Sequence, residues 1–325
     1  MRNKTSNSTE PAQSEWVVTR RSFLKSSGLV IAGLGASRSA LFAAESGAPT
    51  KLSFGIVTDS HYADIPPSGR FYRESLAKMT ECVNLMNDKK VDFLVMLGDL
   101  IDSGGKHEKG AGDDATLKHL DAIEGVFQKY DGPRYHVLGN HDLEGLSKQQ
   151  FQKHVENTGI DKSATYYSYD LKGIHFVVLD ACFNQKMEPY DHGNFGWRQT
   201  WIPSDQLEWL KKDLASTSKP VIVFVHQLLS GKGNVDVKNS DEVREILEEN
   251  GNVLAAFHGH HHRGKYKLIE GIHYYTLIAM VEGSGEKNSS YAIVEVHTDN
   301  SLTITGYRRA VSEELAAGAT DSKSK

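Results

Sequence analysis

The chain has 325 residues, of which 39% are hydrophobic, and this length suits one large domain or two small ones. Its formal net charge is −5, and without the first 48 residues 31 basic and 39 acidic residues remain, a net charge of −8. An acidic body argues against broad binding to nucleic acid, which needs a positively charged surface, so we expect no nucleic-acid partner.

The first 48 residues resemble an export signal. Residues 19–25 read TRRSFLK, the twin-arginine pattern, and an apolar stretch follows at residues 28–44. A membrane-spanning helix needs about 20 apolar residues, and Arg38 interrupts this shorter stretch. The alternative is a disordered basic tail. The pattern favours export by the twin-arginine machinery to the periplasm or the extracellular space, without a stable membrane anchor.

Strand and helix patterns alternate in the next part of the chain. Apolar strands are predicted at residues 51–59, 91–99 and 134–140, and amphipathic helices at residues 70–87 and 115–130. This β-α-β-α-β order predicts a parallel sheet flanked by helices.

The second half of the chain is richer in strands. A hairpin is predicted around residues 172–173, and helices at residues 204–214, capped by Ser204, and 240–249. Further strands are predicted at residues 219–226, 252–258, 265–269, 272–280, 290–297 and 301–309. We therefore expect one domain at residues 49–311, followed by a small, polar, disordered tail at residues 312–325.

Side chains that commonly bind metals follow five of the apolar strands. They lie in DSH (59–61), GDLID (98–102), GNHD (139–142), His226 and GHHH (259–262). The carboxyl ends of strands in α/β sheets are where sites assemble. Asp, His and Asn supply oxygen and nitrogen ligand atoms, which suit Mn, Fe, Zn or Ni better than soft metals. Each motif alone is weak, but the five together predict a metal centre.

Alternation along an extended chain suggests which of these residues share a direction. Asp59 and His61 would point the same way and could share one ion, and His260 and His262 would share one direction while His261 points elsewhere. Gly259 allows the chain to turn, which removes His258 from that set. The pattern predicts two of the four clustered histidines as ligands, and gives His258 and His261 other roles.

This ordered set of motifs resembles the calcineurin-like metallophosphoesterase superfamily over residues 54–262. The resemblance implies an α/β fold, a four-layer αββα sandwich in which two mixed β-sheets are flanked by helices. It also implies two divalent metal ions, with manganese favoured over Fe, Zn or Ni. Carried over by motif, the first ion would be held by Asp59, His61, Asp99 and His262, and the second by Asp99 as the bridge, Asn140, His226 and His260.

The same resemblance assigns the acid of the reaction. His141 would contact the scissile phosphate and protonate the leaving oxygen, and Asp102 would orient it. A histidine beside an aspartate is a positioned acid at physiological pH. Two clustered divalent ions clamp an in-line displacement and make hydroxide available near neutral pH.

Departures from the family patterns narrow the subfamily. Purple acid phosphatases place a tyrosine ligand where this chain has Asp102, and protein Ser/Thr phosphatases place an arginine where it has Ser103. The segments FGIVTDSHYAD, RFYRESL and PSDQLEWLKKDL resemble manganese-dependent ADP-ribose/CDP-alcohol diphosphatases. Those enzymes typically have glutamine in place of His61 and are not usually exported.

We therefore predict an exported binuclear metal-dependent phosphoesterase. It would hydrolyse a small phosphodiester or nucleotide diphosphate-type substrate by metal-bound hydroxide. One alternative is a phosphomonoesterase that scavenges phosphate, and another is a non-catalytic metal-binding scaffold.

Other residues leave two interpretations open. Arg70 and Arg73 face an anionic substrate or form an exposed helix face. Lys106, His107 and Lys109 lie in a lid or a solvated loop. The aromatic residues of loop 191–203 stack on a base or sugar, or pack against the body; they are Phe195, Trp197 and Trp201. Cys82 and Cys182 are predicted to be two buried thiols.

Overall fold

The computed structural model describes residues 47–103 and 113–317. Residues 1–46 of the predicted export signal, the loop with Lys106, His107 and Lys109, and the last residues of the predicted tail lie outside these ranges. Among the described residues, no helix is long and apolar enough to cross a membrane.

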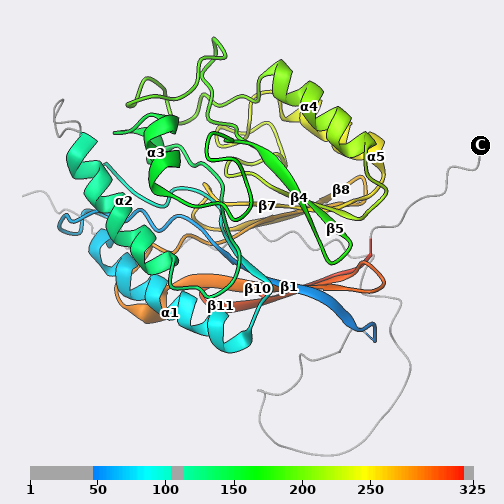
Figure 1. Ribbon diagram of the computed structural model, residues 1–325, viewed down its shortest axis with the longest axis horizontal. Helices are drawn as coiled ribbons and strands as arrows, with labels where there is room; N and C mark the ends of the chain where they lie inside the picture. Colours follow the sequence, from blue (N-terminus) through cyan, green and yellow to red (C-terminus); the bar gives the residue numbers. More distant parts are fainter. Residues whose placement is uncertain (1–46, 104–112, 318–325) are drawn as a thin grey trace, which may run out of the picture.

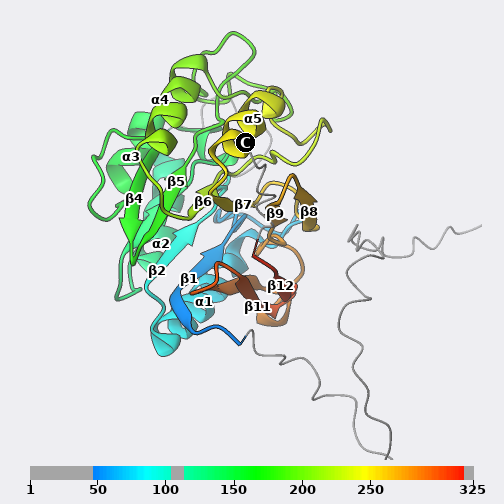
Figure 2. The ribbon, with the colours of Figure 1, turned by 90° about the vertical axis from the view of Figure 1, so that its right-hand side faces the viewer.

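Two six-stranded sheets pack face to face, and helices cover both outer faces (Figures 1 and 2). The first sheet has the order β12-β11-β10-β1-β2-β3. Its strands are β1 (Thr50–Val57), β2 (Phe93–Met96), β3 (Arg134–His136), β10 (Ser290–His297), β11 (Leu302–Arg308) and β12 (Glu313–Leu315). As predicted, β1, β2 and β3 are parallel, but β10 pairs antiparallel with β1 and makes the sheet mixed.

The second sheet has the order β4-β5-β6-β7-β9-β8. Its strands are β4 (Tyr167–Leu171), β5 (Ile174–Val178), β6 (Val221–Phe224), β7 (Val253–His258), β8 (Lys265–Ile269) and β9 (Ile272–Thr276). The predicted hairpin is β4–β5, and its turn residues Lys172 and Gly173 both have positive φ. Such a two-residue turn matches the twist of the strands it joins.

Helices cover the outer face of each sheet. Helices α1 (Ser75–Lys89), α2 (Asp113–Phe127) and α3 (Lys148–His154) lie on the side of the first sheet, and α4 (Ser204–Ala215) and α5 (Ser240–Asn250) on the side of the second. Short 3₁₀ turns lie at η2 (Tyr72–Glu74), η3 (His141–Leu143) and η4 (Glu286–Asn288). The sandwich thus has the predicted four-layer αββα arrangement.

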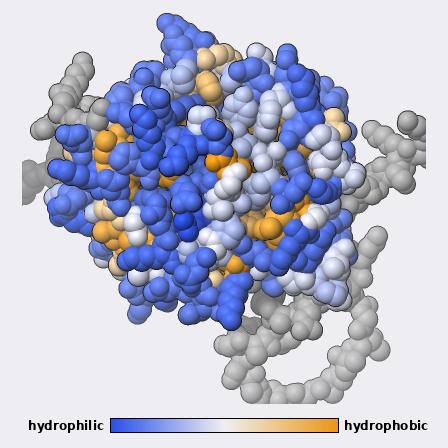
Figure 3. Space-filling model, viewed as in Figure 1, coloured by the Kyte–Doolittle hydropathy of each residue, from blue (hydrophilic) through white to orange (hydrophobic). Residues whose placement is uncertain are grey.

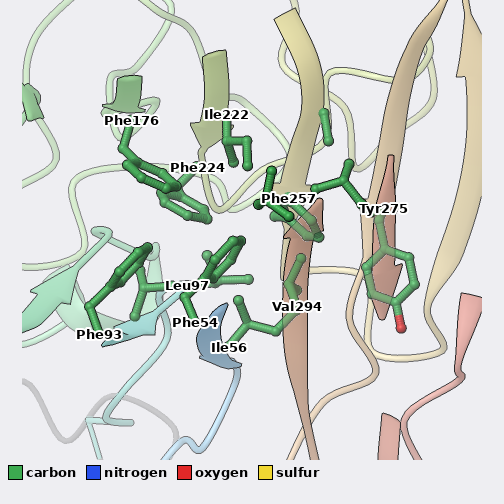
Figure 4. Close-up of a cluster of buried hydrophobic side chains, with 14 of the residues drawn as sticks. Phe54, Ile56, Phe93, Leu97, Phe176, Ile222, Phe224, Phe257, Tyr275 and Val294 are labelled. Carbon is green, nitrogen blue, oxygen red and sulfur yellow. The ribbon is translucent and has the colours of Figure 1, made fainter. Parts of the chain in front are cut away.

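The central core lies between the two sheets. Phe54 and Phe93 from the first sheet face Phe176 and Phe224 from the second (Figure 4). Along β2, successive side chains alternate between this core and the layer beneath α1 and α2. Each central strand is therefore apolar on both faces, which explains its unbroken hydrophobic run in the sequence. The face shown in Figure 3 is mostly hydrophilic, with small apolar areas between polar ones.

Three local features differ from the sequence prediction. Helix α3 was not predicted; Ser147 caps it, with Gln150 completing a capping box. Helix α4 has Pro203 as its N-cap and no side-chain cap, so Ser204 does not play that role. The tail begins as strand β12, because Leu315 is buried between the sheets and pairs with Leu302.

Candidate metal centre

The predicted site residues meet at the carboxyl ends of five strands, three from the first sheet and two from the second. The Asp59 and His61 amides donate to the carbonyls of Gly98 and Asp99, so the loops after β1 and β2 are tied together at 3.0 Å. His226 crosses between the sheets, with Nδ1 2.8 Å from the Leu97 carbonyl oxygen. The sandwich therefore brings side chains from motifs as far apart as Asp59 and His262 into one cluster.

The backbone at this cluster is not extended. Four of the proposed ligands have left-handed φ, namely Asp59 (50°), His61 (44°), Asp99 (54°) and His260 (65°). Each such residue costs of order 1–3 kcal/mol and persists only where the surroundings enforce it. The premise of strict alternation is therefore wrong: these side chains converge because the chain turns sharply at each strand end.

One group of ligand atoms forms around Asp59. The Nε2 atoms of His61 and His262 lie 3.1 Å apart, and they lie 3.6 Å and 3.3 Å from Asp59 Oδ1. Asp59 Oδ2 accepts hydrogen bonds from the Thr58 hydroxyl at 2.7 Å and the His260 amide at 3.1 Å. Oδ1 is buried without a hydrogen-bond partner among the described residues, so it is the oxygen available to a cation.

A second group forms around His226 and His260. Ligand atoms of Asp99, His226 and His260 lie within 4.8 Å of one another. The Nε2 atoms of both histidines, and both amide atoms of Asn140, are buried and have no hydrogen-bond partner in the described chain. Buried polar atoms are rarely left unpaired, so the unpaired nitrogen and oxygen atoms of this group fit a cation-binding role.

Asp99 joins the two groups. Its Oδ1 accepts from the His141 amide at 2.7 Å. Its Oδ2 lies 3.6 Å from His61 Nε2 in the first group and 3.1 Å from His226 Nε2 in the second. A single carboxylate oxygen thus faces both groups, which is the placement that a bridging ligand needs.

The electrostatics of the cluster favour bound cations. Burial alone would raise the pKa of the Asp99 carboxyl, but His226 and His141 hold it far below its usual range. Burial likewise opposes ionisation of Asp59, yet His262 keeps its pKa well below the ordinary value. Burial lowers the pKa of His260 to about 3, so this imidazole is neutral and able to act as a ligand.

The donor set therefore fits two divalent ions. Nitrogen and oxygen donors without thiolates suit Mn, Fe, Zn or Ni. His262 Nδ1 also lies 2.6 Å from Glu282 Oε1, and His226 Nδ1 lies 2.8 Å from the Leu97 carbonyl oxygen. Partners of this kind fix the orientation of metal-binding histidines.

The predicted acid lies beside this centre. His141 Nδ1 is 3.3 Å from Asp102 Oδ2 and 3.1 Å from Glu144 Oε1. Arg70 reaches into the site, where its Nη1 lies 3.3 Å from Asp102 Oδ2. Arg73 instead pairs with Asp64 at the surface. Arg70 therefore lies in the site, whereas Arg73 lies at the surface.

Three supporting carboxylates were not identified from the sequence: Glu282, Glu144 and Asp142. Asp142 is the last residue of the GNHD motif. It accepts hydrogen bonds from the amides of Gly139, Asp99 and Ile101 at 2.9–3.1 Å. Burial and the nearby Asp99 raise the pKa of Asp142 to about 7. Asp142 therefore binds the loop after β3 to the loop after β2.

The other residues of interest differ in their surroundings. His258 is buried with Nδ1 3.1 Å from the Val225 carbonyl oxygen, while His260 and His262 carry the ligand atoms of the two groups. In the aromatic loop, Phe195 stacks on Tyr190, whereas Trp197 lies beside His260 with 44% of its surface exposed. Cys82 and Cys182 are free and buried, as predicted.

Comparison with known proteins agrees with this geometry. The family model of calcineurin-like phosphoesterases matches residues 52–264. The manganese-dependent ADP-ribose/CDP-alcohol diphosphatase of Oryza sativa is 28% identical over 307 residues, 81% of this chain and 93% of that protein. Its counterpart from Arabidopsis thaliana is 25% identical over 316 residues, covering 81% and 96%.

Among solved structures, a dimetal phosphatase from Danio rerio shares the fold. It aligns with a TM-score of 0.70 at 21% identity, over 83% of this chain and 100% of that one. The family model covers more than half of the chain and includes all the strand ends described above. The chain therefore belongs to the calcineurin-like phosphoesterase family and is a hydrolase of phosphoric ester or anhydride bonds.

Proposed function

We propose that the chain is an exported binuclear hydrolase that cleaves a nucleotide diphosphate-type substrate or a small phosphodiester. The observation that carries this proposal is the position of Asp99 Oδ2, within 3.6 Å of ligand nitrogens from both groups. Asp59, His61, Asp99 and His262 would hold one ion, and Asp99, Asn140, His226 and His260 the other. Manganese is favoured because the related diphosphatases are named as manganese-dependent.

When bound, the two ions would polarise the phosphate and supply hydroxide near neutral pH. The side chains of the protein do the rest. His141 would give its proton to the leaving oxygen as the phosphorus–oxygen bond breaks. Burial lowers the pKa of His141, but Asp99 and Asp102 raise it, with a net value well above the usual one.

The substrate class is supported by the relatives and by Trp197. The Oryza and Arabidopsis proteins are named for ADP-ribose and CDP-alcohols, whose diphosphates carry a base at one end. Trp197 presents an exposed indole whose ring centre is 5.8 Å from that of His260. Arg198 lies over the same indole at 4.4 Å. An aromatic ring beside the metal ligands offers a stacking surface for a base.

Export is a separate part of the proposal. It is supported by the TRRSFLK segment and the short apolar stretch after it. The twin-arginine route carries folded proteins, so the ions could be loaded before export. Replacing Arg20 and Arg21 by lysine should retain the protein in the cytoplasm, which fractionation would reveal; unchanged export would contradict this part.

Metal titration tests the catalytic proposal. The full-length chain, stripped with a chelator, should be inactive on ADP-ribose and CDP-choline. Activity should return as Mn²⁺ is added and should level off at two equivalents per chain. A plateau at one equivalent, or full activity of the stripped protein, would contradict a binuclear centre.

A further inference from the structure

His141 has a second carboxylate neighbour besides Asp102. Glu144 follows His141 by three residues across the 3₁₀ turn η3, and residues three apart lie above one another in such a turn. Its Oε1 lies 3.1 Å from His141 Nδ1, closer than Asp102 Oδ2 at 3.3 Å. Its other oxygen, Oε2, accepts from the Ser103 hydroxyl at 2.9 Å. Glu144 is therefore fixed at one oxygen and places the other within ion-pair distance of the imidazole.

The nearest oxygen of Asp102 is shared among three groups. Oδ2 lies 3.3 Å from His141 Nδ1, 3.5 Å from His61 Nδ1 and 3.3 Å from Arg70 Nη1. A carboxylate oxygen has two lone pairs, so three donors compete for it. The contact between Asp102 and His141 is consequently one of several, and Asp102 alone does not define the orientation of the ring.

We propose that Glu144 is a positioning residue for His141. It holds the Nδ1 edge of the imidazole, so that Nε2, on the opposite side of the ring, faces the leaving oxygen. Asp102 then chiefly joins His61 and Arg70 to the same hydrogen-bonded cluster. This inference rests on the proposed role of His141 as the proton donor.

Substrates with different leaving groups distinguish an effect of Glu144 on proton donation by His141 from a general effect on the structure. Two substrates are compared, the 4-nitrophenyl and phenyl esters of thymidine 5′-monophosphate. They differ only in the departing phenol, and 4-nitrophenolate leaves readily without a proton whereas phenolate does not. For the full-length Mn²⁺ enzyme, Glu144→Ala should lower kcat on the phenyl ester about 10-fold, a typical loss for an outer-shell partner. On the 4-nitrophenyl ester kcat should change by less than about 3-fold, since proton donation contributes little there.

Conservative and control variants sharpen the comparison. Glu144→Gln keeps an oxygen near Nδ1 and should recover part of the phenyl-ester activity. Glu156→Ala, at an exposed glutamate paired with Arg134, should leave both rates unchanged. In a His141→Ala background, Glu144→Ala should have no further effect, because its partner is gone. Additive losses, or equal losses on both esters, would overturn the proposal.

The two hypotheses fail in different ways. If His141→Ala lowers the phenyl-ester rate selectively but Glu144→Ala does not, only the role of Glu144 is refuted. If His141→Ala lowers both rates equally, the proton-donor assignment is wrong and the inference falls with it.

A spectroscopic measurement needs no turnover. In ¹⁵N-histidine-labelled protein loaded with Zn²⁺, which unlike Mn²⁺ is diamagnetic, the Nδ1–H resonance of His141 should be observable and should weaken by solvent exchange in Glu144→Ala. An unchanged resonance would also overturn the inference.

Discussion

Several of the proposed ligands have one atom bound to the protein and another that faces the ligand cluster. Asp99 directs Oδ1 to an amide and Oδ2 to the ligand cluster, and His262 binds Glu282 through Nδ1 while Nε2 faces Asp59. This division means that the protein orients the side chains before any ion binds. Single substitutions at these atoms should therefore affect metal content more than folding.

Asp99→Asn tests the bridge. The variant keeps the size of the side chain but loses the charge that faces both groups. We expect bound manganese, measured by elemental analysis of the full-length chain, to fall from two ions to one or fewer. We expect kcat to fall by at least about 100-fold, the upper end of losses for an outer-shell partner. Asp241→Asn, at an exposed ion pair with Lys232, should change neither value; two ions retained in Asp99→Asn would refute the bridge.

Trp197→Ala tests the stacking surface. Loss of the indole should raise KM for CDP-choline by roughly 5- to 100-fold, the range expected for one base–aromatic stack. On bis(4-nitrophenyl) phosphate, which has no base, KM should stay nearly constant. Trp197→Phe keeps an aromatic ring and should recover most of the affinity. Equal effects on both substrates would show that Trp197 only supports the local fold.

At the scale of elements, the strand ends approach so closely that glycine is required. A Cβ at Gly259 would lie 2.0 Å from Thr58 Oγ1 and 2.7 Å from Asp59 Oδ2. Gly259→Ala should therefore displace Asp59, reduce metal content and destabilise the fold in a chemical denaturation experiment. Gly125→Ala makes the same change in helix α2, where a Cβ meets nothing within 4 Å. That variant should instead gain about 0.5–1 kcal/mol. Equal stabilities of the two variants would refute the close approach.

His175 links strand β5 to its neighbours and gives the stability a pH dependence. Its ring nitrogens lie 2.8 Å from Asp213 on α4 and from Asp170 on β4. The hydrogen bond to Asp213 raises the pKa of His175, burial lowers it, and Asp170 raises it further, with a net increase. A raised pKa in the folded state adds stability that is complete below the unfolded value of about 6.5. That stability is lost as the pH rises through the folded value.

The substitution His175→Gln should remove this pH-dependent contribution to stability. Its loss in unfolding free energy, measured with urea, should be larger near pH 6 than near pH 9. A larger loss at high pH would contradict the assignment.

The sequence predicted most of these elements but not how the sheets are completed. The strands of the first half were predictable because each is a continuous apolar run, and the ligands because polar residues follow each run directly. The pairing of β10 with β1 joins residues about 240 positions apart, which no local pattern reveals. Glu282 was missed because it lies beside His262 only in the folded chain, and Glu144 because its contact with His141 depends on the 3₁₀ turn η3, which the sequence does not indicate. The left-handed backbone at Asp59 and Asp99 depends on loop contacts that the sequence does not display.

At the scale of the molecule, the site exists because two sheets meet at their carboxyl ends. The first sheet contributes Asp59, His61, Asp99 and Asn140, and the second contributes His226, His260 and His262. Neither sheet alone carries a complete set of the ligands proposed for either ion. The stability of the sandwich and the geometry of the site are therefore linked, and metal binding should raise the unfolding temperature.

The most direct test of the central claim is a comparison of substrates on the full-length chain with Mn²⁺. The panel contains an aryl phosphomonoester, an aryl phosphodiester, ADP-ribose and CDP-choline. We predict that kcat/KM for the diphosphates or the diester exceeds that for the monoester. A preference for the monoester would contradict the account and favour phosphate scavenging, and no turnover with two ions bound would favour a non-catalytic scaffold.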